Sequence, residues 1–177
     1  SILLPKLIMS ISEVADKIVI TSSINGNIFP KSEKEVLFPV IIDASNTKIE
    51  IKGSIYARDI IIDSGEITIH GPLASKGDIK LINSEGIFKS LAGMTTLSGI
   101  ILGERKASND QLSKGINNCR ALIKGDIVSN TNVILNDSIV FGSINAVNCT
   151  LINSIVLGTV YCNEKLSIEM STIGAYT

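Results

Sequence analysis

The chain has 177 residues, of which 45% are hydrophobic and only 4% aromatic, and this is enough apolar material for one domain with a substantial core. Its net charge of −1 comes from 16 basic and 17 acidic residues that form no basic stripe, which argues against a nucleic-acid partner. No apolar stretch is long enough to span a membrane within this chain. The three cysteines lack metal-ligand spacing, so neither a disulfide framework nor a metal site is expected.

The absence of a disulfide framework favours a reducing, cytoplasmic location. The chain begins at Ser1 rather than Met, and it ends at Thr177 shortly after Gly174 opens what resembles a further repeat unit. We therefore expect a domain of a longer protein, which flanking segments outside this sequence would be able to attach to a membrane.

Residues 1–48 follow no regular pattern, and we expect an irregular N-terminal cap or degenerate first turns of the repeat that follows. Ser12–Asp16 is compatible with one helical turn, whereas Lys17–Ile20 and Val36–Ile42 are typical of strands. A cap would cover the open sheet edge that every stack of strands exposes at its end.

A short unit recurs through residues 49–177: glycine, any residue, an aliphatic residue, any residue and a small residue. Successive copies start 16 to 18 residues apart, except for one interval of 36 residues, or two periods, between Lys89 and Gly125. We interpret Lys89–Gly93 as a copy in which Lys replaces the glycine. The aliphatic column comprises Ile55, Leu73, Leu91, Ile127, Ile144 and Val160, and the small column comprises Ala57, Ser75, Gly93, Ser129, Ala146 and Cys162.

This repeat predicts an all-β, single-stranded β-solenoid with three short strands in each 16–18-residue rung. Alternation by two places both columns on one strand face, and the corners carry Gly, Asn, Asp and Ser, which tolerate turns. A β-sandwich with irregular strands is the alternative, but a sandwich gives no reason for the small column to repeat. In the first rung the expected inward pairs are Ile60 and Ile62, followed by Ile67 and Ile69. In later rungs we expect Val133 and Leu135 to align with Cys149 and Leu151, and with Leu166 and Ile168, and we expect Ile139 and Phe141 to align with Ile155 and Leu157.

The segment from residue 104 to residue 118 is polar and interrupts the repeat, so we expect a loop that leaves one rung. Such a loop offers a surface for a partner, carried by Glu104, Arg105, Lys106, Asp110 and Lys114.

The repeat unit resembles that of the bactofilin-like polymer-forming proteins, most clearly at Gly53–Ala57, Gly125–Ser129 and Gly142–Ala146, over about residues 49 to 177. The resemblance implies a right-handed β-helix and a cytoskeletal or scaffold protein that polymerises end to end without nucleotide. The chain differs from that family in its polar insertion and its irregular start, and an N-terminal cap would block one end of a polymer.

Catalysis is not expected, because no group of residues has the pattern of an active site. His70 is the only histidine, whereas the left-handed β-helix acyltransferases usually rely on a His base in a cleft between subunits. Carbohydrate-active β-helix enzymes group carboxylates on one outer face, but the candidates here fall at corners or strand starts. These are Asp59, Asp63, Glu66, Asp78 and Glu85.

The cysteines favour packing over chemistry. Cys149 and Cys162 fall in inward columns, where a buried, reduced thiol behaves as a small hydrophobic group. Cys119 lies near the polar loop, with no neighbour that would lower its pKa.

We therefore expect a structural or scaffold β-helix, without cofactor, that associates with itself or with another protein through the ends of the coil. The last rung would supply the open edge, carried by Gly158, Val160, Leu166, Ile168 and Ile173. A binding module that recognises a protein or a glycan through a solenoid face or the 104–118 loop is the second hypothesis. A carbohydrate-active or acyltransferase-like enzyme is the third.

Overall fold

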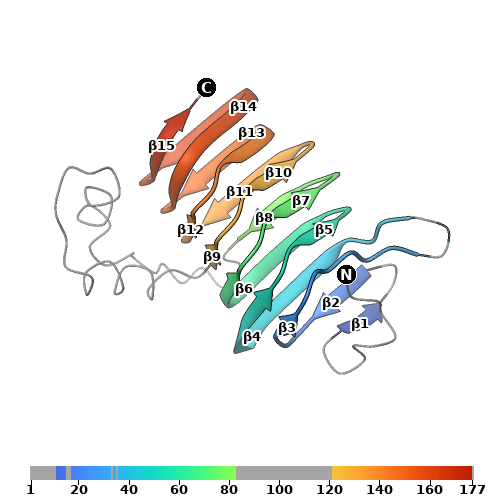
Figure 1. The fold of residues 1–177 in the computed structure, drawn as a ribbon. Helices are drawn as coiled ribbons and strands as arrows, with labels where there is room; N and C mark the ends of the chain where they lie inside the picture. Colours follow the sequence, from blue (N-terminus) through green and yellow to red (C-terminus); the bar gives the residue numbers. More distant parts are fainter. Residues whose placement is uncertain (1–10, 15–16, 33, 35, 83–120, 177) are drawn as a thin grey trace.

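The computed structural model describes residues 11–14, 17–32, 34, 36–82 and 121–176. These residues contain strands and no helix, and the strands form one 15-stranded sheet that coils on itself as a β-solenoid (Figure 1). Every strand pairing is parallel except that between β1 and β2, and this is the pattern expected when each turn of a coil pairs with the next. The strands are β1 (Ile11–Val14), β2 (Lys17–Ile20), β3 (Ile24–Asn25), β4 (Val40–Lys52), β5 (Ile55–Ala57), β6 (Ile60–Ile69), β7 (Leu73–Ser75), β8 (Ile79–Leu81), β9 (Ala121–Ile123), β10 (Ile127–Ser129), β11 (Asn132–Asn136), β12 (Ser138–Val140), β13 (Ile144–Ile152), β14 (Ile155–Glu169) and β15 (Thr172–Tyr176).

Each turn has three sides, which we call faces A, B and C in chain order. Face A consists of β2, the first part of β4, the first part of β6, β8, β11, and the last parts of β13 and β14. Its inward column is joined by six successive parallel pairings, so seven strand segments stack on this face. The column comprises Ile18, Val40, Ile60, Ile79, Val133, Cys149 and Leu166.

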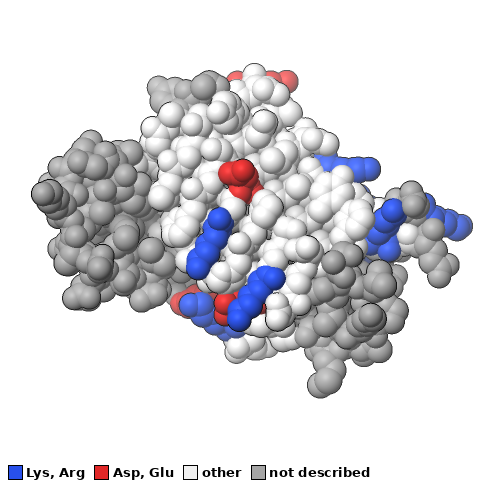
Figure 2. All heavy atoms as spheres, viewed as in Figure 1, with Lys and Arg blue, Asp and Glu red and all other residues white. Residues whose placement is uncertain are grey.

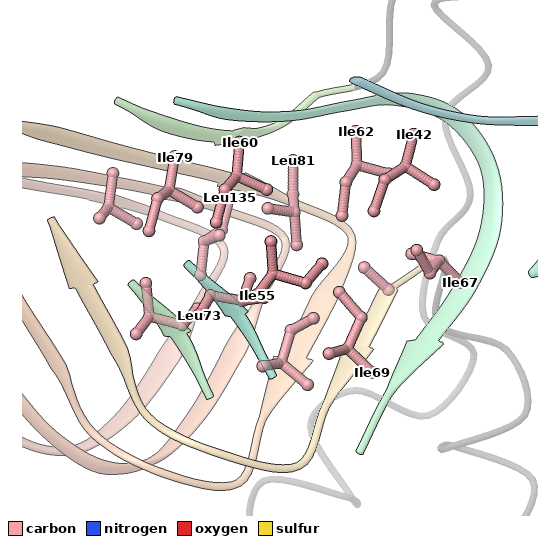
Figure 3. Packing of buried hydrophobic residues seen from close by; sticks show 14 of the residues in the cluster. Ile42, Ile55, Ile60, Ile62, Ile67, Ile69, Leu73, Ile79, Leu81 and Leu135 are labelled. Carbon is pink, nitrogen blue, oxygen red and sulfur yellow. The ribbon is translucent and has the colours of Figure 1, made fainter. Parts of the chain in front are cut away.

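Faces B and C complete the triangle around one aliphatic core. The inward column of face B comprises Ile24 of β3, Ile51, Ile69, Ile123, Val140, Val156 and Ile173. That of face C comprises Ile28, Ile55, Leu73, Ile127, Ile144 and Val160. Side chains from the three faces meet in the interior (Figure 3), where most are completely buried. Stiff β-branched side chains suit this interior, because each must repeat the same inward position at every turn.

The corner between faces B and C requires glycine because successive turns approach too closely for a side chain. A Cβ built on Gly71 would lie 2.7 Å from the carbonyl oxygen of Gly53, and one on Gly125 would lie 2.5 Å from the nitrogen of Pro72. Contacts this short do not occur for real Cβ atoms, so the recurring glycine of the repeat is a steric requirement.

The corner between faces C and A carries the small column. The Ser129 hydroxyl donates a hydrogen bond to the carbonyl of Gly77 over 2.6 Å and accepts one from the amide of Thr131 over 3.0 Å. The Ser75 hydroxyl bridges the backbone in the same way in the turn before. Small polar side chains therefore satisfy buried backbone groups where the chain bends.

The predicted columns are wrong at one copy of the repeat unit. Leu73 pairs directly with Ile127, and Ile79 pairs directly with Val133, so the Lys89–Gly93 copy does not stand between them as expected. That copy lies outside the described residues. Ile79 and Val133 are 54 positions apart in the chain, whereas Val133 and Cys149 are 16 apart. Residues 83–120, which include the predicted 104–118 loop, lie between β8 and β9 in the chain and outside the described residues.

On face B, the inward residues also differ from those predicted. Ile139 pairs with Ile155 as expected, and both are buried. The interior cluster nevertheless contains Val140 and Val156 rather than these two residues, and Phe141 and Leu157 are exposed. The reason is that the corner residue Asp137 adopts a left-handed conformation with φ 53°, which makes Ser138 the first inward residue after the corner.

The N-terminal part already belongs to the coil. The expected helical turn at Ser12–Asp16 is wrong for residues 12–14, which belong to β1, a strand that pairs antiparallel with β2. The predicted domain boundary after residue 48 falls inside β4, because Ile49 is a core residue that stacks on Ile67.

Candidate functional site

The two ends of the hydrophobic core differ. At the N-terminal end, Ile18 and Ile20 are fully buried, and β1 occupies the edge of β2. At the C-terminal end, Ile168 occupies the same inward column as Leu135 and Leu151, yet it is 45% exposed while they are fully buried. Among the described residues, the core is therefore covered at its N-terminal end and uncovered at its C-terminal end.

The uncovered end consists of Lys165–Glu169 on face A and β15 on the other two faces. Lys165–Glu169 pairs with β13 along one edge, and no described strand pairs with its other edge. β15 pairs with β14 in the same one-sided manner. Backbone groups along an unpaired edge are able to accept another strand, and Met170, between these two segments, adds an exposed apolar side chain.

The structure places the predicted edge residues in two different turns. Leu166, Ile168 and Ile173 lie in the last turn, as expected. Val160 lies one turn earlier, fully buried, with partners on both sides in Ile144 and Tyr176, and Gly158 is covered by Gly174. These two residues are therefore not part of the edge. The predicted partner-loop residues Glu104, Arg105, Lys106, Asp110 and Lys114 lie outside the described residues.

Two of the five carboxylates that were considered as catalytic candidates, Asp59 and Asp78, connect turns of the coil. Asp59 accepts a hydrogen bond from the amide of Asp78 over 2.8 Å. Asp78 accepts one from the Thr131 hydroxyl over 2.6 Å and another from the Asn132 amide group over 3.0 Å. The Asp59 bond joins two successive turns, and the Asp78 bonds join two turns whose residues lie on either side of positions 83–120 in the chain. The two aspartates therefore have a structural role.

Burial opposes the ionisation of Asp78, but the hydrogen bonds from Thr131 and Asn132, together with the nearby Lys80 ammonium, outweigh it. The pKa of Asp78 is consequently lowered from its ordinary value. A carboxylate with a depressed pKa is fully ionised at neutral pH and is not suited to act as a general acid there.

We expect Asp78→Asn to destabilise the protein at pH 7 more than at pH 3. A group whose pKa is lower in the folded state contributes stability above its unfolded pKa, and that contribution is lost as the pH falls through the folded pKa. Urea denaturation of both proteins at the two pH values measures the effect. The prediction is wrong if Asp78→Asn lowers the free energy of unfolding by the same amount at both pH values.

The remaining enzyme candidates do not form one site. His70 is an exposed residue, and its Nε2 lies 2.7 Å from Oε1 of Glu50 in the preceding turn. Asp63 lies at another corner, where its Oδ1 has no hydrogen-bond partner among the described residues. Glu85 lies outside the described residues. Within the described ranges, no group of three or more His, Cys, Asp and Glu residues is arranged to hold a metal ion.

Two cysteines lie where the repeat predicted them. Cys149 is buried in the face A column, and Cys162 occupies the small column, where its thiol lies 2.8 Å from the carbonyl oxygen of Lys165. Burial, and to a smaller extent Cys162, raises the pKa of the Cys149 thiol to about 12. Cys149 is therefore a protonated packing group at neutral pH. Cys119 lies outside the described residues.

Face C carries an outward column that the sequence analysis did not single out. It includes Tyr56 and Tyr161, which are 38% and 46% exposed, with three uncharged residues between them. The Phe29 ring lies 5.3 Å from that of Tyr56. The signal was present in the fourth position of each repeat unit, which alternation places outside. The column comprises Tyr56, Ala74, Val128, Asn145 and Tyr161.

Charged side chains are few and scattered on the side of the molecule that Figure 2 shows. Among the described segments, none is a helix long and apolar enough to cross a membrane. Comparison with known proteins gives no assignment, since no family model, curated protein or solved structure matches the chain.

Proposed function

We propose that the chain is a structural β-solenoid that associates with a second copy of itself through its C-terminal turn. The observation that carries the proposal is the unequal covering of the core, with Ile20 fully buried at one end and Ile168 45% exposed at the other. Pairing along Lys165–Glu169 would satisfy edge backbone groups and remove apolar surface from water in one step.

Two further features support a structural role. One cluster of apolar side chains runs through the described turns, and the corner carboxylates connect turns. The resemblance of the repeat unit to the bactofilin-like proteins agrees with self-assembly. The covered N-terminal end argues for association through one end only.

Ile168→Asp is expected to abolish self-association while preserving the fold, because it places a charge in an apolar contact at a site that is solvent-accessible in the single chain. The measurement is sedimentation velocity across a concentration series, with circular dichroism as the check on folding. Electron microscopy of the same samples would show whether association proceeds to filaments.

Val128→Asp is the matched control, since Val128 is 43% exposed but lies on face C, away from the end of the coil. This variant should associate like the original chain. The proposal is wrong if the original chain is monomeric at every concentration, or if Ile168→Asp associates as well as Val128→Asp does.

A second candidate function is glycan binding on face C, favoured by the exposed Tyr56, Phe29 and Tyr161 rings. Aromatic rings offer large, rigid contact surfaces with a polar tip at Tyr, and the five residues of the outward column carry no charge. Electrophoresis through gels that contain neutral polysaccharides separates this function from self-association, because retardation by the polysaccharide does not require a second copy.

A further inference from the structure

The exposed strand segment at the end of face A has a self-complementary sequence. Residues 165–169 read Lys-Leu-Ser-Ile-Glu, with a cation at one end, an anion at the other and two aliphatic residues flanking a central serine. Leu166 and Ile168 point inward, because they continue the columns of Cys149 and Leu151. Alternation therefore directs Lys165, Ser167 and Glu169 outward.

Antiparallel pairing of this segment with its own copy brings complementary groups together. If Ser167 lies opposite Ser167 of the second copy, Lys165 lies opposite Glu169 and Leu166 lies opposite Ile168. Residues directly opposite each other on antiparallel strands interact, and opposite charges there stabilise while like charges destabilise. Both charged side chains are exposed, and neither belongs to an ion pair within the described part of the chain.

The symmetry of the contact follows from the difference between the two ends. A polar filament would require the C-terminal turn to pair with the N-terminal turn of the next copy, but β1 already occupies the edge of β2 on face A. The C-terminal turn of a second copy has the same free edge as the first. A two-fold axis relates two such edges with their strands antiparallel, and the resulting contact is closed.

We propose that two copies of the chain pair antiparallel along Lys165–Glu169, in the register that centres the two-fold axis on Ser167, and form a closed dimer. This inference rests on the proposed self-association and specifies its partner strand, register and stoichiometry. The contact places the exposed Ile168 against Leu166 of the second copy, so that each core covers the other.

The test is a set of charge reversals read by sedimentation equilibrium at low ionic strength, where screening is weak. Lys165→Glu alone and Glu169→Lys alone each place like charges opposite one another at both symmetry-related pairs. Each variant by itself should dimerise at least about tenfold more weakly than the original chain. Because both side chains are exposed, circular dichroism should show an unchanged fold.

Two combinations separate this register from others. A 1:1 mixture of the two single variants should form a heterodimer of near-original affinity, because each chain then meets opposite charges. The double variant K165E/E169K should dimerise with itself for the same reason. The mixture also verifies folding, since a misfolded variant would not recover binding.

The proposal fails if the single reversals leave dimerisation unchanged, or if the mixture and the double variant do not recover it. If Ile168→Asp nevertheless abolishes association, the proposed function stands with a different register. If neither the charges nor Ile168 affects association, both the function and the register are wrong. Filaments or higher oligomers of the original chain would contradict the closed dimer.

Discussion

Replacement of Ile60 by Ala is expected to lower the free energy of unfolding by about 2–5 kcal/mol. Ile60 is fully buried and stacks between Val40 and Ile79 on face A. Its removal would leave a cavity that the coil cannot close, because backbone hydrogen bonds fix each turn at the spacing of its neighbours. Urea denaturation followed by circular dichroism gives the free energy directly.

Ile61→Ala is the control for this measurement, because the same side chain is removed one position along the same strand. Ile61 points outward and is half-buried, so its loss removes less buried surface and creates no interior cavity. We expect a cost of about 1 kcal/mol or less. Equal destabilisation by the two variants would show that face A does not alternate as described.

Substitution of Gly142 by Ala is expected to destabilise the protein by about 1–3 kcal/mol, although it adds only one methyl group. The new Cβ would lie 2.7 Å from both the carbonyl carbon and the carbonyl oxygen of Gly125, and it would also contact Oδ1 of Asp126. The obstacle is mainly backbone from the preceding turn, so relief requires two turns of the coil to move apart.

Asn145→Ala provides the comparison within the same turn. Asn145 is exposed on the outside of face C, and a surface substitution of this kind usually changes stability by about 0.5 kcal/mol or less. The midpoint temperatures of thermal unfolding should therefore be similar for the original chain and Asn145→Ala, and clearly lower for Gly142→Ala. A Gly142→Ala variant as stable as the control would contradict the steric origin of the glycine column.

The repeat in the sequence was sufficient to predict the solenoid and most of its register. Ile55, Leu73 and Ile127 occupy one column, and Val133 stacks on Cys149, as predicted. Such positions can be predicted from the sequence because every turn offers the same environment, so the same residue type is required at the same point. The glycine and small columns were readable for the same reason.

The structure could not be predicted from the sequence at positions where one turn differs from the next. Leu91 fits the local pattern, but the hydrogen-bonded partner of Leu73 is Ile127, and nothing local to either residue specifies that partner. Ile139 was placed inward from its aliphatic character, whereas the left-handed corner at Asp137 reverses the alternation after it. Residues 12–14 form a strand because the edge of β2 offers backbone partners, which outweigh a weak helical preference.

The candidate site was likewise predicted only in part. The sequence identified Leu166 and Ile168 as parts of an inward column, because they repeat the pattern of earlier turns. It did not reveal that Val160 is covered while Ile168 is exposed, since exposure depends on which strands lie on either side of a turn.

For this protein, the sequence by itself determined the repeating unit: three short strands, an aliphatic interior, a glycine corner and a small-residue corner. It did so because each of these is a local steric or hydrophobic requirement repeated at every turn. Only the tertiary structure decided which turns are adjacent and which end of the described core is uncovered. These features depend on pairing between residues that are distant in the chain. A local sequence pattern does not specify a partner 54 positions away.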